Sequence, residues 1–215
     1  PEISVATTKA YSAQLIAVYT LALQFAKERN EIEMPEYEKL IKELDTLPDK
    51  IQEVIDNQEE IQKFAAKQAA AKDVFFIGRG IDYAVSLEGS LKLKEISYIH
   101  SEAYAAGELK HGTISLIEDG TLVIGVLTQD ELYEKTISNM VECKSRGAYL
   151  MGLTTYGNYT VEDTAKFTVY VPKTDAHFMA SLAVVPLQML GYYVSVAKGL
   201  DVDKPRNLAK SVTVE

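Results

Sequence analysis

The hydrophobic pattern changes character along the chain. As far as Lys72 the apolar residues follow helical spacing, and from Asp73 onward short runs of β-branched and aromatic residues alternate with helical segments. Because parallel strands are joined by crossover helices, this alternation predicts an α/β fold with a doubly wound parallel sheet and helices on both faces. Ligands of such sheets bind beyond the carboxyl ends of the strands. The expected strands are VFFIG, TLVIGVL, AYLMGLT and FTVYVP, and the expected helices lie near residues 82–98, 130–146 and 180–198.

The first third of the chain is predicted to be helical. Residues 8–29 carry apolar side chains on nearly all faces, which predicts a helix buried on several sides. Two acidic, amphipathic helices are expected after it, over residues 36–44 and 49–72. Pro35 and Pro48 fit this interpretation, because a helix tolerates proline in its first turn.

Composition and charge limit the kinds of molecule that the chain is expected to bind. The chain has 215 residues, is 47% hydrophobic and carries a formal net charge of −9. The acidic balance argues against nucleic acid and against an anionic membrane surface, since both require clustered Lys and Arg. The apolar run at 10–26 is interrupted by polar residues and lacks the ~20 apolar residues of a spanning helix. We therefore expect small metabolites or proteins as partners, with no nucleic acid and no membrane.

The cysteine and glycine patterns predict neither a metal nor a cofactor. Cys143 is the single cysteine, so an internal disulfide is impossible, and we expect a cytoplasmic protein with no signal peptide. No HxxxH or HExxH spacing is present, so no metal site is expected. Gly78 and Gly80 follow a strand, but Tyr83 stands where the dinucleotide fingerprint requires a third glycine. We interpret this segment as a tight strand-to-helix turn.

The predicted helix near 82–98 carries a row of charged residues. Glu88, Lys92 and Glu95 fall within roughly 60° of one another at ~100° per residue. A carboxylate beside a lysine could serve as a general base if this face borders a cavity. Spacing alone favours the other interpretation, a solvent-facing row of salt bridges. Lys94 is expected to point elsewhere, into solvent.

Two further residues have side chains capable of chemistry but lack a decisive context. His111 lies in the segment GELKHG, which has neither helical nor strand periodicity, and an imidazole there could carry protons or simply be exposed. Lys210 lies in an extended tail, where a lysine is normally a mobile, solvated amine. Burial would be needed to make that amine a nucleophile toward a carbonyl carbon.

Three stretches carry a resemblance to a known family: LEGSLKLKEISYIHSEAYAAGELKHG at 87–112, PRNLAKSVTVE at 205–215 and PEISVATTKAYSAQ at 1–14. They resemble the glucosamine-6-phosphate synthase family, and the match runs through essentially the whole chain. The resemblance implies a flavodoxin-like sugar-isomerase (SIS) fold, present twice in the isomerase module of that family. A separate glutamine-hydrolysing domain precedes both copies.

The resemblance also implies a division of the chain into three parts. Residues 1–46 would be the C-terminal remnant of the first SIS subdomain with a linking helix. Residues 47–200 would form the second SIS subdomain, and residues 201–215 a C-terminal catalytic tail. The apolar helix at 8–29 would then be exposed in this chain by itself, which favours oligomerisation.

The implied activity converts fructose 6-phosphate and ammonia from glutamine into glucosamine 6-phosphate, without a cofactor. By the resemblance, Lys210 forms a Schiff base with the C2 carbonyl of the open-chain sugar. Glu95 moves a proton between C1 and C2, and Lys92 is its catalytic neighbour on the helix. His111 is implied in sugar-ring opening and is donated by the adjacent subunit of a homodimer.

Four residues are assigned to substrate binding: Val5, Thr7, Ala209 and Glu88. The first three match family positions that line the sugar pocket. Thr7 stands where many members have serine, which preserves the hydroxyl. Residues 113–114 are Thr-Ile where Pro-Leu is common, and this departure leaves the catalytic residue types intact.

A departure of greater weight is the absence of the family's phosphate-binding Ser-Gln-Ser run from these 215 residues. We therefore expect this polypeptide by itself to be inactive or nearly so. Two alternatives stay open: an SIS-type sugar-phosphate-binding regulatory module, and a dimerisation scaffold. A regulatory module needs no catalytic lysine, so the tail sequence NLAKSVTVE argues against it.

Overall fold

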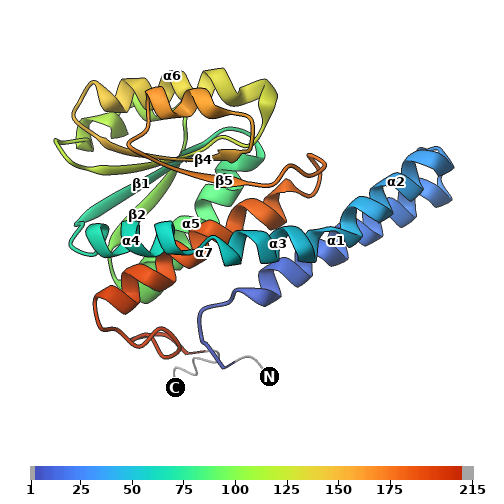
Figure 1. Ribbon diagram of the computed structural model, residues 1–215, viewed down its shortest axis with the longest axis horizontal. Helices are drawn as coiled ribbons and strands as arrows, with labels where there is room; N and C mark the ends of the chain where they lie inside the picture. The colour runs from blue at the N-terminus through green and yellow to red at the C-terminus, as the bar shows by residue number, and fades with distance from the viewer. Residues whose placement is uncertain (1–2, 210–215) are drawn as a thin grey trace.

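The computed structural model describes residues 3–209 and shows a five-stranded parallel sheet between two layers of helices (Figure 1). The strands are β1 (Asp73–Gly78), β2 (His100–Ala105), β3 (Leu122–Val126), β4 (Tyr149–Thr155) and β5 (Phe167–Val171). The α-helices are α1 (Lys9–Glu28), α2 (Met34–Asp45), α3 (Leu47–Asp56), α4 (Glu59–Gln68), α5 (Ile81–Ser97), α6 (Tyr133–Lys144) and α7 (Met179–Ala197). Short 3-10 helices are η1 (Leu109–His111), η2 (Thr113–Leu116), η3 (Asp130–Leu132) and η4 (Tyr159–Asp163).

The order of the strands confirms the predicted doubly wound sheet. The strands lie in the order β2-β1-β3-β4-β5, and every neighbouring pair is parallel. All five residues of β3 are buried, as expected for a strand covered on both faces. The chain leaves β1 toward β2 on one side and returns to β3 on the other, so the switch in winding direction falls between β1 and β3.

Strand β2 is absent from the strands that the sequence predicts, whereas the other four are among them. Its sequence, HSEAYA, has no continuous apolar run, and most of its residues are only partly buried. β2 lies at the edge of the sheet, where a strand has one neighbour and needs less apolar surface. The polar pattern therefore hid a strand that pairs with β1 along its whole length.

Helices α4, α5 and α7 cover one face of the sheet, and α6 covers the other (Figure 1). Helix α7 is long and apolar enough to cross a membrane by length and composition alone. Of its most apolar window, 72% is buried inside the fold. Its apolar surface is accounted for by packing against α5, α4 and α3.

The helix expected over 49–72 is two helices. Helix α3 ends at Asp56, and α4 begins at Glu59. The Asn57 side chain donates a hydrogen bond to the carbonyl oxygen of Glu53 at 2.9 Å. An asparagine that bonds to the preceding turn competes with continuation of the helix, which gives a physical reason for the break.

Helix α1 lies mostly outside the core. Leu23 is buried, whereas Val18, Leu21 and Phe25 are 59%, 54% and 61% exposed. Figure 1 shows α1 and α2 extending away from the sheet as an arm. The prediction of a helix buried on several sides is therefore wrong for this chain. The structure instead has the exposure that the family resemblance implied.

Two glycines at the contact between α5 and α7 are predicted to respond differently when each is replaced by alanine. A Cβ at Gly89 would lie 2.6 Å from Leu187 Cδ1 and 3.1 Å from Phe76 Cε1, whereas one at Gly191 would meet its nearest atom, Leu93 N, at 3.5 Å. Overpacking costs about 1–3 kcal/mol. Alanine at a helical glycine gains up to about 1 kcal/mol. We expect Gly89→Ala to lower the urea midpoint of unfolding and Gly191→Ala to leave it unchanged or raise it. Equal shifts in the two variants would contradict the close contact at Gly89.

Candidate functional site

Helix α5 carries three charged side chains in a row along one face. Lys92 Nζ lies 2.5 Å from Glu95 Oε2 and 3.7 Å from Glu88 Oε1. The side chain of Lys92 is 4% exposed, and those of Glu88 and Glu95 are 13% and 22% exposed. Spacings of three and four residues bring the groups together, as predicted. The solvent-facing salt-bridge row, which spacing alone favoured, is wrong because the packing around α5 buries the lysine.

The electrostatics of this row follow from its burial. Burial raises the pKa of Glu88; the Lys92 charge opposes this shift, and the Glu95 charge adds to it. Burial and the charge of Glu88 together raise the pKa of Tyr11 to about 12. The buried ammonium fixes one oxygen of the Glu95 carboxylate. The other oxygen can then exchange a proton with a bound ligand.

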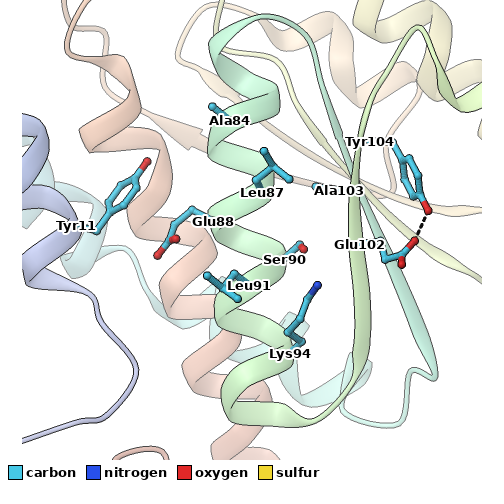
Figure 2. A pocket seen from close by; sticks show the side chains of 10 residues that line it. All are labelled: Tyr11, Ala84, Leu87, Glu88, Ser90, Leu91, Lys94, Glu102, Ala103 and Tyr104. Atoms are coloured by element: carbon cyan, nitrogen blue, oxygen red, sulfur yellow. Dashed lines mark hydrogen bonds between the residues drawn. The ribbon is translucent and has the colours of Figure 1, made fainter. Parts of the chain in front are cut away.

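Two pockets lie along the exposed side of α5. The first, here called the Glu88 pocket, has a volume of 590 Å³ and lies between α1, α5 and β2. Figure 2 shows Glu88 on the side of α5 that faces Tyr11, while Lys94 points toward β2. The second, here called the Glu95 pocket, has a volume of 530 Å³. The two pockets share Leu91 and Lys94, so both carboxylates of the row border one continuous stretch of surface.

The C-terminal segment reaches the Glu95 pocket. Arg206, Asn207 and Leu208 line this pocket together with Glu95 and Tyr98. The Arg206 backbone N–H donates a hydrogen bond to the Tyr98 hydroxyl at 2.7 Å. The Arg206 guanidinium also lies 4.2 Å from the centre of the Tyr98 ring, a cation–π contact. The tail is therefore attached to the end of α5, one turn beyond Glu95.

Three predicted substrate-binding residues, Val5, Thr7 and Ala209, and the predicted catalytic Lys210 lie near this attachment in the sequence or in space. Ala209 is exposed and is the last residue that the structure describes, and Lys210 lies outside the described residues. Val5 and Thr7 are partly buried in the segment before α1. The Val5 N–H donates to the carbonyl oxygen of Asp203 at 2.9 Å, so the two ends of the described chain lie side by side (Figure 1).

His111 lies apart from the row on α5. It is an exposed residue of η1, in the loop that follows β2. It lines neither the Glu88 pocket nor the Glu95 pocket. The chain by itself therefore brings together Glu88, Lys92 and Glu95 but leaves His111 outside their pockets. Its donation from an adjacent subunit stays a prediction.

Tyr98 and Tyr11 are two residues of this region that the sequence analysis did not single out. Tyr98 caps α5 in the left-handed conformation, with φ of 61°, which is uncommon for a residue with a side chain. It is one of 13 tyrosines, and nothing in its sequence context marks the contact with Arg206. Tyr11 lies on α1 and lines the Glu88 pocket, on the side that faces Glu88 (Figure 2). No periodicity or motif in the sequence indicates the contact of Tyr98 or the position of Tyr11.

The structure also bears on the glycine turn after β1, on the single cysteine and on the possible metal ligands. Gly80 has a φ of 54°, and a Cβ at Gly78 would lie 2.5 Å from the backbone of Asp82, which confirms a tight turn. Cys143 is buried, and burial raises the pKa of its thiol to about 12, which makes it unreactive. Among residues 3–209, no group of three or more His, Cys, Asp or Glu side chains is arranged to hold a metal ion.

The 2-1-3-4-5 sheet and the pockets beside α5 define an α/β domain of the flavodoxin-like class. The chain belongs to the SIS domain family, whose model matches residues 69–198. It is 57% identical over its whole length to the glutamine–fructose-6-phosphate aminotransferase (isomerizing) of Caldanaerobacter subterraneus subsp. tengcongensis. It is 56% identical to the enzyme of the same name from Clostridium tetani. The chain spans 35% of the length of each of these curated relatives.

Solved structures agree with this assignment. The C-terminal domain of glucosamine-fructose-6-phosphate aminotransferase from Francisella tularensis is 34% identical, with a TM-score of 0.86 over 94% of this chain and 57% of that chain. A glucosamine-6-phosphate deaminase from Thermotoga maritima is 26% identical, with a TM-score of 0.74 over 98% of this chain and 58% of that chain. The sugar isomerase domain of an RpiR transcription factor from Sphaerobacter thermophilus is 18% identical, with a TM-score of 0.61 over 73% of this chain and 89% of that chain, and shares the fold alone.

Proposed function

We propose that the chain is the isomerase part of a glutamine–fructose-6-phosphate aminotransferase (isomerizing), which makes glucosamine 6-phosphate from fructose 6-phosphate and ammonia. The observation that carries the proposal is the contact of the buried Lys92 with the partly exposed Glu95, beside a pocket that the C-terminal segment also lines. Lys210 follows that segment directly in the sequence. The named relatives support the choice of reaction, and a regulatory module would need no amine in the tail.

The proposed chemistry assigns one task to each group. The Lys210 amine condenses with the C2 carbonyl of the open-chain sugar, forming an imine and releasing water. Ammonia then adds at C2 and the lysine leaves, so that the new nitrogen remains on the sugar. Glu95 takes a proton from C1 and returns one to C2, while the C1 hydroxyl loses its proton and the nitrogen gains one. The C2 imine thereby becomes an amine, and C1 becomes an aldehyde. Lys92 holds the carboxylate of Glu95 in place during both transfers.

Substrate binding and assembly complete the proposal. Val5, Thr7, Glu88 and Ala209 contact the sugar phosphate. The protein acts as a homodimer, and His111 of the adjacent subunit assists ring opening. An exposed position for His111, outside both pockets of its own chain, is compatible with such a transfer. The division into a first-subdomain remnant at 1–46, a second SIS subdomain at 47–200 and a tail at 201–215 belongs to the same proposal.

Borohydride trapping tests the proposed nucleophile. The full-length polypeptide is incubated with fructose 6-phosphate and borohydride, and the reduced adduct is mapped by mass spectrometry. We expect the adduct on Lys210 and its loss in Lys210→Arg. An adduct on another lysine would remove the central assignment. The 215-residue chain alone is expected to show no isomerisation, because the phosphate-binding run of the family is absent from it.

A further inference from the structure

A buried carboxylate fills the crevice where doubly wound sheets bind their ligands. The winding of this sheet switches between β1 and β3, and ligands of such folds lie outside the carboxyl ends of the strands at that point. Asp82 lies in the first turn of α5, directly after the β1–α5 turn. The residues that follow β3 are Thr128 and Gln129. Asp82 thus lies between the two connections that border the crevice.

The carboxylate of Asp82 accepts three hydrogen bonds from the segment after β3. The Thr128 N–H and hydroxyl donate to it at 2.8 and 2.5 Å, and the Gln129 N–H donates at 3.3 Å. Asp82 is 1% exposed. The Gln129 side chain donates to the carbonyl oxygen of Arg79 at 2.6 Å, which ties the same segment to the β1–α5 turn.

These donors form the kind of site that proteins use for oxyanions. Two consecutive backbone N–H groups and a hydroxyl converge on one negatively charged group, close to the positive end of the α5 dipole. Phosphate groups are held at helix N-termini by donors of the same types. Thr128 and Gln129 also line a neighbouring pocket of 380 Å³, which contains Lys173. A ligand in that pocket would therefore meet a segment whose donors are already engaged.

We propose that the β1–β3 crevice is an oxyanion site that the chain fills with the carboxylate of Asp82, so that it does not bind the phosphate group of a ligand. The side chain acts as an internal substitute for the anion. The crevice is thereby closed in this domain, and a sugar phosphate must be held through its phosphate by other residues. This inference rests on the geometry of Asp82 and stands independently of the proposed function.

Chemical rescue of an Asp82→Ala variant tests the proposal. Alanine removes a carboxylate the size of formate and leaves the donors of Thr128 and Gln129 unpaired. We expect formate to shift the amide resonances of these two residues saturably in Asp82→Ala and to raise the urea midpoint of that variant. Chloride at equal ionic strength should do neither. Asp82→Ser, which leaves space beside a hydroxyl, replaces Asp82→Ala if the latter does not fold.

The wild-type chain and Asp82→Asn are the matched controls. Both keep a side chain of the same shape in the crevice, so neither formate nor inorganic phosphate should shift the Thr128 and Gln129 amides. Two results would overturn the proposal. One is a saturable shift of these amides by phosphate in the wild-type chain. The other is the absence of any formate response in a folded Asp82→Ala or Asp82→Ser variant.

Discussion

Replacing Lys92 by methionine is expected to lower the free energy of unfolding by up to about 3–5 kcal/mol, because it leaves two partly buried carboxylates without their cation. Methionine keeps the unbranched aliphatic part of the side chain, so the effect reports the lost charge more than lost packing. Glu88 and Glu95, which now share Lys92, would face each other uncompensated. Urea unfolding of the 215-residue chain at neutral pH measures the change as a shift of the midpoint at constant slope.

Lys94→Met is the matched control for this variant. Lys94 lies on the same helix two residues further on, and it is exposed. Surface substitutions of this kind usually change stability by no more than about 0.5 kcal/mol. If Lys92→Met and Lys94→Met shift the midpoint equally, the contacts of Lys92 with the two carboxylates contribute nothing measurable, and the row on α5 has no special energetic role.

Replacing Glu95 by glutamine is expected to lower kcat roughly 10²–10⁴-fold in the full-length enzyme, the range that a general base contributes. The amide oxygen can still accept a hydrogen bond from Lys92 Nζ, so the fold should be far less affected than by Lys92→Met. KM should change little, since the group is proposed to act in proton transfer and not in uniform binding. Initial rates with fructose 6-phosphate and glutamine provide both constants.

Two controls sharpen the test of Glu95. Glu102→Gln removes a carboxylate that lines the Glu88 pocket, where Tyr104 donates a hydrogen bond to it (Figure 2), and should leave kcat unchanged. Mixing Glu95→Gln subunits with His111→Ala subunits tests the shared site. Hybrid dimers would regain activity if each site combines Glu95 of one subunit with His111 of the other. An unchanged kcat in Glu95→Gln would contradict the proposed base.

The sheet was predictable because its inner strands and crossover helices follow distinct apolar patterns. The run at 122–126 predicts a strand buried on both faces, and the structure has β3 there, fully buried. The edge strand β2 escaped prediction because its stability comes from backbone pairing with β1 and not from its own apolar residues. The break at Asn57 escaped prediction because one side-chain hydrogen bond decides it within an otherwise continuous helical pattern.

The candidate site was predictable in its spacing but not in its environment. Helical geometry alone places Lys92 beside Glu88 and Glu95, whereas the burial of Lys92 depends on elements far away in the sequence. The contact between Arg206 and Tyr98 likewise joins residues more than a hundred positions apart. Such contacts leave no periodic trace in the sequence, so only the folded chain reveals them.

The attachment of the tail to Tyr98 has a mechanical consequence. Glu95 and Tyr98 lie three positions apart at the end of one helix, and the Tyr98 hydroxyl accepts a hydrogen bond from the backbone of Arg206, four residues before Lys210 in the sequence. A tilt or slide of α5 therefore moves the Glu95 carboxylate and the tail backbone at Arg206 by nearly the same distance in the same direction. Reorientation of the SIS domain as a unit therefore leaves the spacing between Glu95 and the start of the tail almost constant, so the two groups proposed to react need no separate device to keep them in step.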